Sequence, residues 1–245
     1  MTRIAIIGAG SLVFSSRLTA DILTYPHLRD AHFALVDIDP ERLAYAGRIV
    51  ERICRDGAYG DASYSLHQDR RTALAGADYV IISILVGGYD AIETEIDIPR
   101  RYGVDQAIGD TLTPGGVMRC LRTLPPLLEM GRDIVAHCPN AWVLNYTNPM
   151  AMLCWGMNQG VPGIRLVGLC HSVQHTTQQW AHRLRVPLDD VDFECAGLNH
   201  QAWIVRFAHK GHDLLPRIRD LAVNPRVWRK DTSRMEYVKH FGYPV

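Results

Sequence analysis

A short apolar strand that runs straight into a glycine turn and a helix restricts the fold of this chain more than any other feature of its sequence. Residues 3–7 read RIAII, residues 8–11 read GAGS, and a helix is expected over 12–25. A strand over 32–37 and a helix from Pro40 to about Cys54 repeat the unit. Because strands that alternate with crossover helices pair in parallel, this repetition predicts a doubly wound parallel sheet.

The alternation continues along the chain to about residue 170. Further strands are expected over 63–67, 79–85, 141–147 and 165–170, and further helices over about 71–75, 116–130 and 149–159. The continuously apolar run at 79–85 is typical of a parallel strand that is buried on both faces. Pro125 and Pro126 should kink or divide the helix over 116–130, because proline cannot donate a helical hydrogen bond.

The pattern changes after about residue 190. The segments VDFECAGLN and QAWIVRFAHKGH have the pattern of an antiparallel hairpin, and no obvious helix or strand follows to close the fold before the chain stops at HFGYPV. The predicted fold class is therefore α/β. A Rossmann-like, doubly wound parallel sheet over 1–190 is followed by the beginning of an α+β second domain over 191–245, which we expect to be incomplete.

The charge and cysteine content exclude several classes of protein. Lysine plus arginine and aspartate plus glutamate number 26 each, so no net basic field favours nucleic acid or anionic lipid. No apolar run approaches the roughly 20 residues that a membrane span needs, and the apolar start is too short for a secretion signal, so we expect a cytoplasmic protein. Six cysteines scattered over 245 residues are not a disulfide framework.

The glycine turn is a candidate site for a dinucleotide. Gly8, Gly10 and Ser11 lie between a strand and a helix, where backbone N–H groups can hold a pyrophosphate. Val13 stands where the usual fingerprint has its third glycine. Asp37, at the end of the second strand, can accept hydrogen bonds from a ribose and repel a 2′-phosphate, which favours NAD over NADP. The alternative is a turn without nucleotide and an aspartate that caps the next helix.

Cys170 and His200 are candidate metal ligands. Cys170 ends a strand of the parallel sheet, where ligands of such sheets collect, and His200 lies at the edge of the expected hairpin. A thiolate and an imidazole suit a divalent transition metal and leave coordination positions for substrate oxygens. Spacing alone favours the alternative, in which the cysteine packs in the core and the histidine lies on the surface.

Two further segments present polar side chains. Asp110 lies in the glycine-rich loop IGDTLTPGG, and Asn148 follows the strand over 141–147. Either residue could face a ligand, or could bond nearby backbone as a turn aspartate or a helix cap. Arg119 and Arg122 could clamp a substrate or form a solvated helix face.

A set of short segments carries a family resemblance. The chain contains, in this order, IGAGS, ALVDIDPERL, VGGYD, IGDTLTPGGVMRCLRTLP, LNYTNPMAM, VGLCHSVQ and CAGLNHQAW. This set resembles glycoside hydrolase family 4, the NAD-dependent glycosidases, and it runs through nearly the whole chain. The CHS sequence at 170–172 is similar to the branch that acts on unphosphorylated sugars, α-galactosidases in particular. α-Glucosides and α-galacturonides are the alternative substrates.

The resemblance implies an unusual use of the cofactor. In family members the C3 alcohol of the sugar is oxidised to a ketone, with hydride passing from C3 to NAD. The ketone acidifies the C2 proton, which is removed, and the aglycone leaves C1 by elimination; water then adds and the hydride returns. Mn²⁺ or another divalent cation holds the C2 and C3 oxygens. The metal ligands implied for this chain are Cys170 and His200.

The resemblance also implies roles for three other residues. Asn148 contacts substrate hydroxyls, His171 is the acid that protonates the leaving group, and Asp110 raises the basicity of the catalytic base. That base is a tyrosine which in the family lies beyond residue 245, so we expect a C-terminally truncated chain. The expected partner is a small-molecule glycoside. Because intact members tend to form dimers or tetramers, a homo-oligomer is a further expectation.

Two other functions fit part of the sequence. A 2-hydroxyacid dehydrogenase of the lactate or malate type shares the nucleotide fold, but it needs a histidine–aspartate pair and substrate arginines and no metal cysteine. A truncated chain that binds NAD without turnover is the second alternative. Accumulation of NADH would favour the dehydrogenase. An exposed apolar face where the second domain should continue would favour the inactive fragment.

Overall fold

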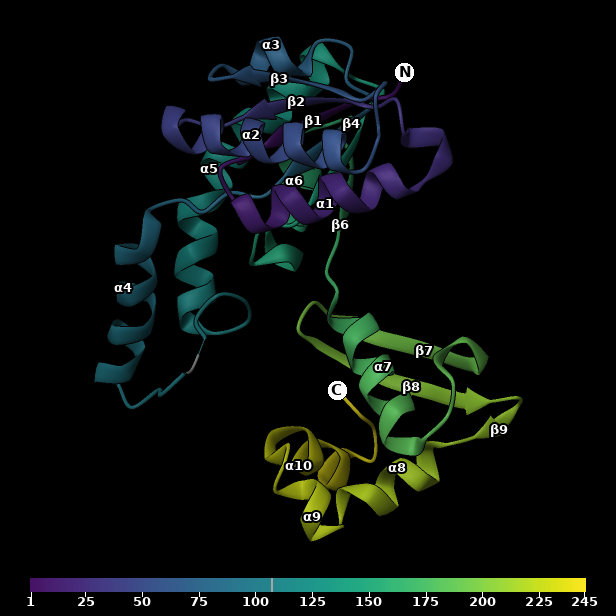
Figure 1. Ribbon diagram of the computed structural model, residues 1–245. Helices are drawn as coiled ribbons and strands as arrows, with labels where there is room; N and C mark the ends of the chain where they lie inside the picture. Colours follow the sequence, from purple (N-terminus) through teal and green to yellow (C-terminus); the bar gives the residue numbers. More distant parts are fainter. Residues whose placement is uncertain (107) are drawn as a thin grey trace. The chain divides into compact units, whose positions relative to one another are not determined.

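The computed structural model describes residues 1–106 and 108–245 and divides into two compact parts (Figure 1). We call Met1–Leu169 the N-terminal unit and Cys170–Val245 the C-terminal unit. This division comes earlier in the chain than the expected boundary at 190, because helix α7 (Ser172–Leu184) contributes Trp180 to the core of the C-terminal unit. The division into an NAD-binding domain over 1–190 and a second domain over 191–245 stays a prediction.

The N-terminal unit is built on a parallel sheet. Its strands are β1 (Arg3–Ile7), β2 (His32–Val36), β3 (Ser63–His67), β4 (Tyr79–Ile82), β5 (Trp142–Asn145) and β6 (Arg165–Gly168). The strand order is β3-β2-β1-β4-β5-β6, and the register places Ala5 opposite Ala34 on one side and Val80 on the other. The strand order reverses between β1 and β4, as it does at the switch point of doubly wound folds. The predicted fold class is confirmed.

Helices connect these strands. They are α1 (Leu12–Thr24), α2 (Pro40–Asp56), α3 (Arg70–Leu74), α4 (Gly88–Arg101), α5 (Pro114–His137) and α6 (Met150–Gly160), with a 3-10 turn η1 (Pro26–Leu28) after α1. The expectation that Pro125 and Pro126 divide α5 is wrong, because the helix continues through both prolines. Leu127 and Ile134, which follow the prolines, are buried in the core, so tertiary packing compensates for the lost helical hydrogen bonds.

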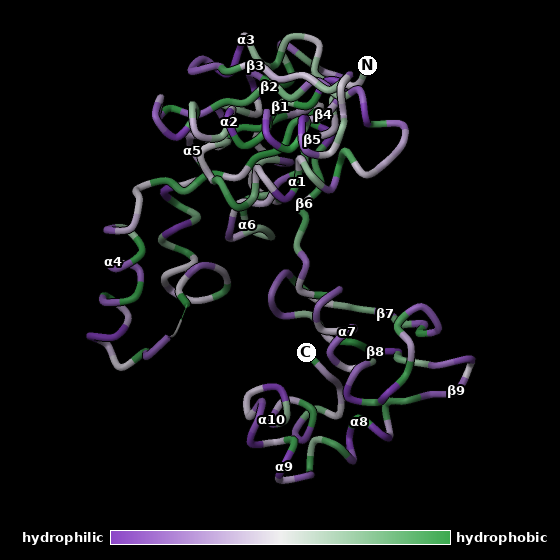
Figure 2. Tube along the Cα trace, viewed as in Figure 1, coloured by the Kyte–Doolittle hydropathy of each residue, from purple (hydrophilic) through white to green (hydrophobic). Residues whose placement is uncertain are grey.

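Alternate residues of β1 face two separate hydrophobic cores. Ala5 and Ile7 pack with residues of α5 and α6, whereas Ile4 and Ile6 pack with residues of α1 and α2. Helices therefore cover both faces of the sheet, and Figure 2 shows hydrophobic residues along its strands. The ends of the strands are the places that remain for a ligand.

The C-terminal unit combines a small antiparallel sheet with helices. β7 (Val191–Leu198) and β8 (Gln201–His209) form the expected hairpin, and β9 (His212–Asp213) pairs with the end of β8. The remaining elements are η2 (Leu188–Asp190), α8 (Leu215–Ala222), α9 (Pro225–Trp228) and α10 (Thr232–Phe241). Trp180, Phe207, Ile218 and Met235 lie together in the core of this unit. The helices after β9 were not apparent in the sequence pattern.

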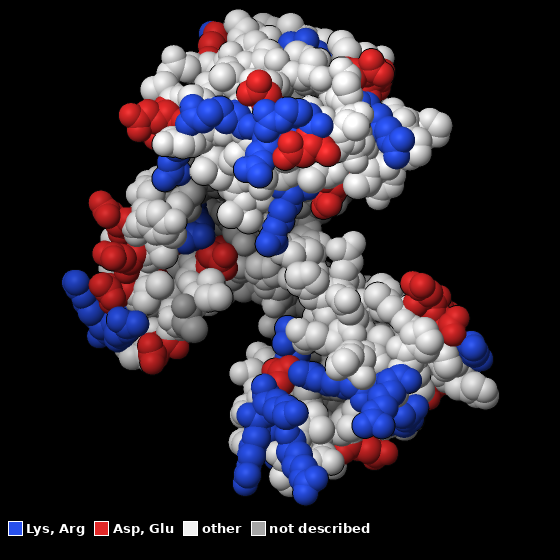
Figure 3. Space-filling model, in the orientation of Figure 1, with Lys and Arg blue, Asp and Glu red and all other residues white. Residues whose placement is uncertain are grey.

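Two features bear on the partners of the chain. Within the described residues, no helix has both the length and the apolar character that a membrane crossing requires. Acidic and basic side chains both occur on the visible face of each unit (Figure 3), in keeping with the equal numbers of the two in the sequence.

Candidate functional site

The glycine turn after β1 leaves no room for side chains at its first position. Gly8 has a φ of +87°, and a β-carbon added to it would lie 2.1 Å from the carbonyl oxygen of Ser83. The N–H groups of Gly8 and Ala9 both donate to Val36 O at 2.9 Å. The turn is therefore held tightly between the ends of β2 and β4, and α1 begins directly after it.

Asp37 joins this turn to the end of β2. Gly10 N donates to Asp37 Oδ2 at 2.6 Å, and Asp39 N donates to Asp37 Oδ1 at 3.0 Å. Asp39, not Asp37, caps α2, because its side chain accepts from the first backbone N–H groups of that helix. The alternative in which Asp37 is the helix cap is therefore wrong. Ser11 stands at the N-cap of α1, where its side chain makes no capping hydrogen bond.

Asp110 and Asn148 contact each other. Asn148 Nδ2 donates to Asp110 Oδ2 at 3.1 Å, and Thr111 Oγ1 donates to Asp110 Oδ1 at 2.7 Å. Thr113, not Asp110, caps α5, and Asn148 does not cap α6. The loop before α5 is thus joined to the segment that follows β5, near the carboxyl end of that strand.

A buried ion cluster lies beside this pair. Glu95 of α4 is 1% exposed; Arg119 of α5 pairs with its Oε2 at 2.6 Å, and Arg122 contacts its Oε1. Arg119 Nη1 lies 4.0 Å from Asp110 Oδ2. Because Arg119 is buried and paired, a solvated helix face is the wrong description of it.

Sequence reasoning missed Glu95. Helix α4 was not expected, and nothing near Glu95 in the sequence distinguishes it from a surface glutamate. The one available signal is the spacing of Arg119 and Arg122, which lie on one side of a helix and need an anion if that side is buried.

In the C-terminal unit, Cys170 and His200 come together although 30 residues separate them in the sequence. Cys170 Sγ lies 3.3 Å from His200 Nε2. The sulfur also lies 3.0 Å from Ser172 Oγ and accepts from Ser172 N at 3.4 Å. Two ligands bound to one divalent ion at about 2.0–2.3 Å lie roughly 3–3.5 Å from each other, so the separation observed here fits shared coordination.

The turn of the hairpin presents His200 to the cysteine. Asn199 and His200 connect β7 to β8, and His200 has a φ of +64°, which is uncommon for a residue with a side chain. Gly197 passes so close to β8 that an added β-carbon would lie 2.4 Å from Gln201 O. Backbone strain of this kind gathers at functional sites, and here it orients a candidate ligand.

A metal at this position would have two protein ligands from this unit. Within the described residues, no group of three or more histidine, cysteine, aspartate or glutamate side chains is arranged to hold a metal ion. A thiolate and an imidazole favour a transition metal, but two ligands alone do not select one metal ion, and Mn²⁺ would need oxygen ligands in addition. Positions left open on the ion are the ones that substrate oxygens can fill.

His171 lies next to Cys170 at the start of α7. It is the N-cap residue of that helix, but its side chain makes no capping hydrogen bond. Its ring packs edge-on against His175, with the ring centroids 4.9 Å apart. The imidazole is therefore oriented by a neighbouring ring and not by the helix end.

Two other cysteines are small residues of a hydrophobic core. Cys138 is buried in the core of the N-terminal unit, and Cys120 packs against that core. Burial raises the pKa of both thiols, which keeps them protonated and makes them poor metal ligands.

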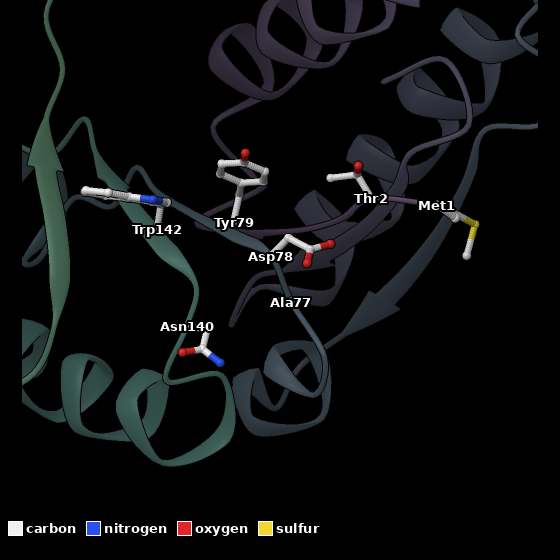
Figure 4. A pocket seen from close by; sticks show the side chains of 7 residues that line it. All are labelled: Met1, Thr2, Ala77, Asp78, Tyr79, Asn140 and Trp142. Atoms are coloured by element: carbon white, nitrogen blue, oxygen red, sulfur yellow. The ribbon is translucent and has the colours of Figure 1, made fainter. Parts of the chain in front are cut away.

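A cavity of about 420 Å³ opens at the amino ends of the parallel strands, opposite to the carboxyl ends that carry the glycine turn (Figure 4). Tyr79 and Trp142, which begin β4 and β5, contribute aromatic rings to it. Its lining residues are Met1, Thr2, Ala77, Asp78, Tyr79, Asn140 and Trp142. None of the candidate site residues from the sequence lines it, and Asp78 Oδ2 accepts from Arg3 N at 2.8 Å. The cavity is thus separate from the glycine turn and from Asp110.

The order of these elements matches known proteins. The model of the family 4 glycosyl hydrolases matches residues 3–186, and the model of their C-terminal domain matches residues 195–245. The chain belongs to family 4 of the glycosyl hydrolases. The resemblance noted in the sequence is confirmed.

Individual members of family 4 are similar over most of this chain. An α-galactosidase from Bacillus subtilis is 40% identical, over 100% of this chain and 57% of the relative. An α-galactosidase from Rhizobium meliloti is 39% identical, over 98% of this chain and 49% of the relative. The chain spans about half the length of the curated relatives that it matches.

Solved structures of family 4 enzymes share the fold. The 6-phospho-β-glucosidase from Thermotoga maritima, solved with NAD and glucose-6-phosphate, is 25% identical with a TM-score of 0.79. The match covers 98% of this chain and 58% of that structure. A second structure of that enzyme, also in the tetragonal form, was solved with manganese, NAD⁺ and glucose-6-phosphate.

Proposed function

We propose that this chain carries the NAD-binding and metal-binding parts of a family 4 α-galactosidase. The observation that carries the proposal is the 3.3 Å contact between Cys170 Sγ and His200 Nε2, which unites the two candidate ligands in one unit. The α-galactosidase relatives favour an α-galactoside as substrate. Family membership favours a glycosidase over the 2-hydroxyacid dehydrogenase alternative.

The N-terminal unit supplies residues that suit NAD. The turn at Gly8, Gly10 and Ser11 lies at the start of α1, where backbone N–H groups favour an anionic pyrophosphate. Each Asp37 oxygen already accepts one backbone N–H and keeps a further lone pair for a ribose hydroxyl. The cofactor site proposed here therefore consists of Gly8, Gly10, Ser11 and Asp37.

Asp110 orients Asn148 for a sugar. Because Asn148 Nδ2 donates to Asp110 Oδ2, the amide oxygen of Asn148 is directed to accept a hydrogen bond from another group. A sugar hydroxyl is such a donor. The Glu95–Arg119–Arg122 cluster fixes the helix that follows Asp110, and so limits the movement of this pair.

The C-terminal unit supplies the metal ligands and an acid. Bound NAD would accept hydride from a sugar carbon and return it, and a bound divalent cation would polarise the sugar oxygens beside that carbon. Cys170 and His200 are the residues that would hold Mn²⁺ or another divalent cation. His171 is the proposed proton donor to the leaving group, since an imidazole can carry a proton near neutral pH.

We also propose that the protein is cytoplasmic and forms a homo-oligomer. The cytoplasm is where NAD is available to an enzyme of this kind, and a homo-oligomer is the assembly that the resemblance implies. The balanced charge of the chain gives no reason to add nucleic acid as a partner. Size-exclusion chromatography with light scattering tests the assembly directly.

The test is release of nitrophenol from p-nitrophenyl α-galactoside by the 245-residue chain with NAD, Mn²⁺ and a thiol reductant. Release that requires all three additions and is lost in Cys170→Ser would establish the redox-elimination mechanism and would show that a base within these residues serves. Cys195→Ser is the matched control, since Cys195 is an exposed cysteine in the same unit. The corresponding α-glucoside and α-galacturonide separate the alternative sugars.

Calorimetric titration with NAD separates the remaining outcomes. NAD binding without nitrophenol release from any glycoside would mean that this chain is the inactive fragment. Accumulation of NADH with a 2-hydroxy acid would support the dehydrogenase. No NAD binding at all would overturn the proposal.

A further inference from the structure

The Cβ atom of Arg42 lies beside the glycine turn and Asp37. It lies in the first turn of α2, and a β-carbon added to Gly10 would lie 2.8 Å from Arg42 Cβ and 2.5 Å from Asp37 Oδ2. Gly10 thus touches both residues. The Asp37 carboxylate and the base of the Arg42 side chain therefore both lie against Gly10, and the flexible, exposed guanidinium is within reach of the same end of β2.

Helix stability does not account for an arginine at this position. The N-terminal end of a helix carries a partial positive charge, which disfavours a cation in the first turn. The one ion pair of Arg42 in the described structure is with Asp39, at 3.7 Å, and the two side chains are 61% and 46% exposed. Exposed pairs of this kind contribute little. An anionic ligand beside the turn would account for the guanidinium better.

Ile38 points to the same ligand. It lies between Asp37 and the start of α2, and it is 92% exposed. An aliphatic side chain so exposed gains by contact with a flat apolar surface, such as the adenine ring of a dinucleotide. The segment after β2 therefore offers a carboxylate for ribose hydroxyls, an apolar contact for the base and a cation nearby.

We propose that Arg42 is a latent ligand for a 2′-phosphate, and that the charge of the Asp37 carboxylate keeps the chain from using NADP. This inference rests on the NAD binding proposed above. A 2′-phosphate carries nearly two negative charges at neutral pH and accepts hydrogen bonds from a guanidinium in a fork. With Asp37 ionised beside it, that phosphate is repelled; without the charge, Arg42 can bind it.

The experiment measures Kd for NAD and for NADP by calorimetry in a series of variants. Asp37→Asn removes the charge but keeps one acceptor for the backbone N–H groups of the turn. Its affinity for NADP is expected to rise about tenfold or more, which is the size of one charged hydrogen bond gained. Asp37→Asn with Arg42→Ala should lose that gain.

The matched control is Arg48→Ala in the Asp37→Asn background. Arg48 is an exposed arginine on the same helix, where it packs over the Tyr45 ring at 4.2 Å. The NADP gain is expected to survive this change. If Arg48→Ala removes the gain as fully as Arg42→Ala does, a general loss of positive charge explains it and the inference is wrong.

Other outcomes are equally decisive. If Asp37→Asn does not raise the affinity for NADP, or if the rise persists when Arg42→Ala is added, the proposed role of Arg42 is wrong. The proposal that the chain binds NAD is unaffected by either result. Failure of the unaltered chain to bind NAD overturns the proposed function as well. Should Asp37→Asn unfold, Asp37→Ser with and without Arg42→Ala gives the same test, because serine also removes the charge and keeps an acceptor for the turn.

Discussion

The two units of the molecule are stabilised in different ways. In the N-terminal unit helices cover both faces of the sheet, and four of the five residues of β1 are buried. In the C-terminal unit no residue of β7 is buried, and Ile204 and Phe207 of β8 lie in a single core. The candidate cofactor residues therefore lie on a sheet that is covered on both faces. Of the candidate metal ligands, His200 lies in the turn of an exposed hairpin and Cys170 lies just before α7. Ligand binding should therefore raise the stability of the C-terminal unit more than that of the N-terminal unit.

The largest expected effect is the difference in stability lost when a buried ion pair of the N-terminal unit is broken and when an exposed ion pair of the C-terminal unit is broken. Glu95→Gln removes the carboxylate that pairs with the buried Arg119 and the half-buried Arg122 and leaves Arg119 only the longer contact with Asp110, so we expect the free energy of unfolding of the N-terminal unit to fall by about 3–5 kcal/mol. Urea unfolding followed by circular dichroism measures this. Arg206→Ala is the matched control, because Arg206 pairs with Asp192 and Glu194 on the exposed face of the C-terminal hairpin. It should change little, and an equal loss in the two variants would contradict the comparison.

The second largest expected effect is the stabilisation that a bound metal ion gives to the C-terminal unit and not to the N-terminal unit. At about 100 times its Kd, Mn²⁺ is expected to stabilise the C-terminal unit by about 2.7 kcal/mol and to leave the N-terminal unit unchanged. Hydrogen exchange measured by mass spectrometry reads the two units separately. Cys170→Ala should abolish the added protection, and Cys195→Ser should preserve it. Protection that persists in Cys170→Ala would remove this cysteine from the metal site.

Two glycines of the N-terminal unit separate backbone strain from steric conflict. Gly76 has a φ of +71° and open space around an added β-carbon, so Gly76→Ala should cost only about 1 kcal/mol of stability. Gly8→Ala meets Ser83 O as well, and about 2 kcal/mol or more is expected, together with weaker NAD binding. Thermal unfolding and calorimetry measure both. Equal costs would show that the glycine turn can relax around a methyl group.

A histidine pair should make the N-terminal unit sensitive to mild acid. Burial, and then the charge of Arg3, lowers the pKa of His32 and of His67 below the ordinary value of 6.5. The unfolded chain therefore binds protons that the folded unit resists. Stability is complete above about pH 6.5 and decreases as the pH falls through the lowered pKa values.

Urea unfolding of the N-terminal unit at about pH 7.5 and about pH 5.5 measures this smallest effect. His32→Gln with His67→Gln should give a shallower pH dependence than the unaltered chain. An unchanged slope would assign the acid sensitivity to other groups.

The local sequence was sufficient to predict the fold where a short pattern repeats or where a turn accepts only one type of residue. The parallel strands, the hairpin and the glycine turn were all expected, and Gly8 is required at its place because any β-carbon there meets Ser83 O. Helix α5 was expected as well, but not its continuity through Pro125 and Pro126. That continuity depends on the burial of residues after the prolines, which the local sequence does not report.

The candidate site divides in the same way. Residue types and their neighbours in sequence marked Asp37, Asp110, Asn148, Cys170 and His200 as candidates. That Cys170 meets His200, that Asp110 meets Asn148, and that Glu95 neutralises two arginines were decided only by tertiary structure. The physical reason is that periodicity and turn chemistry act between near neighbours, whereas contacts between distant residues depend on how packed elements bring them together.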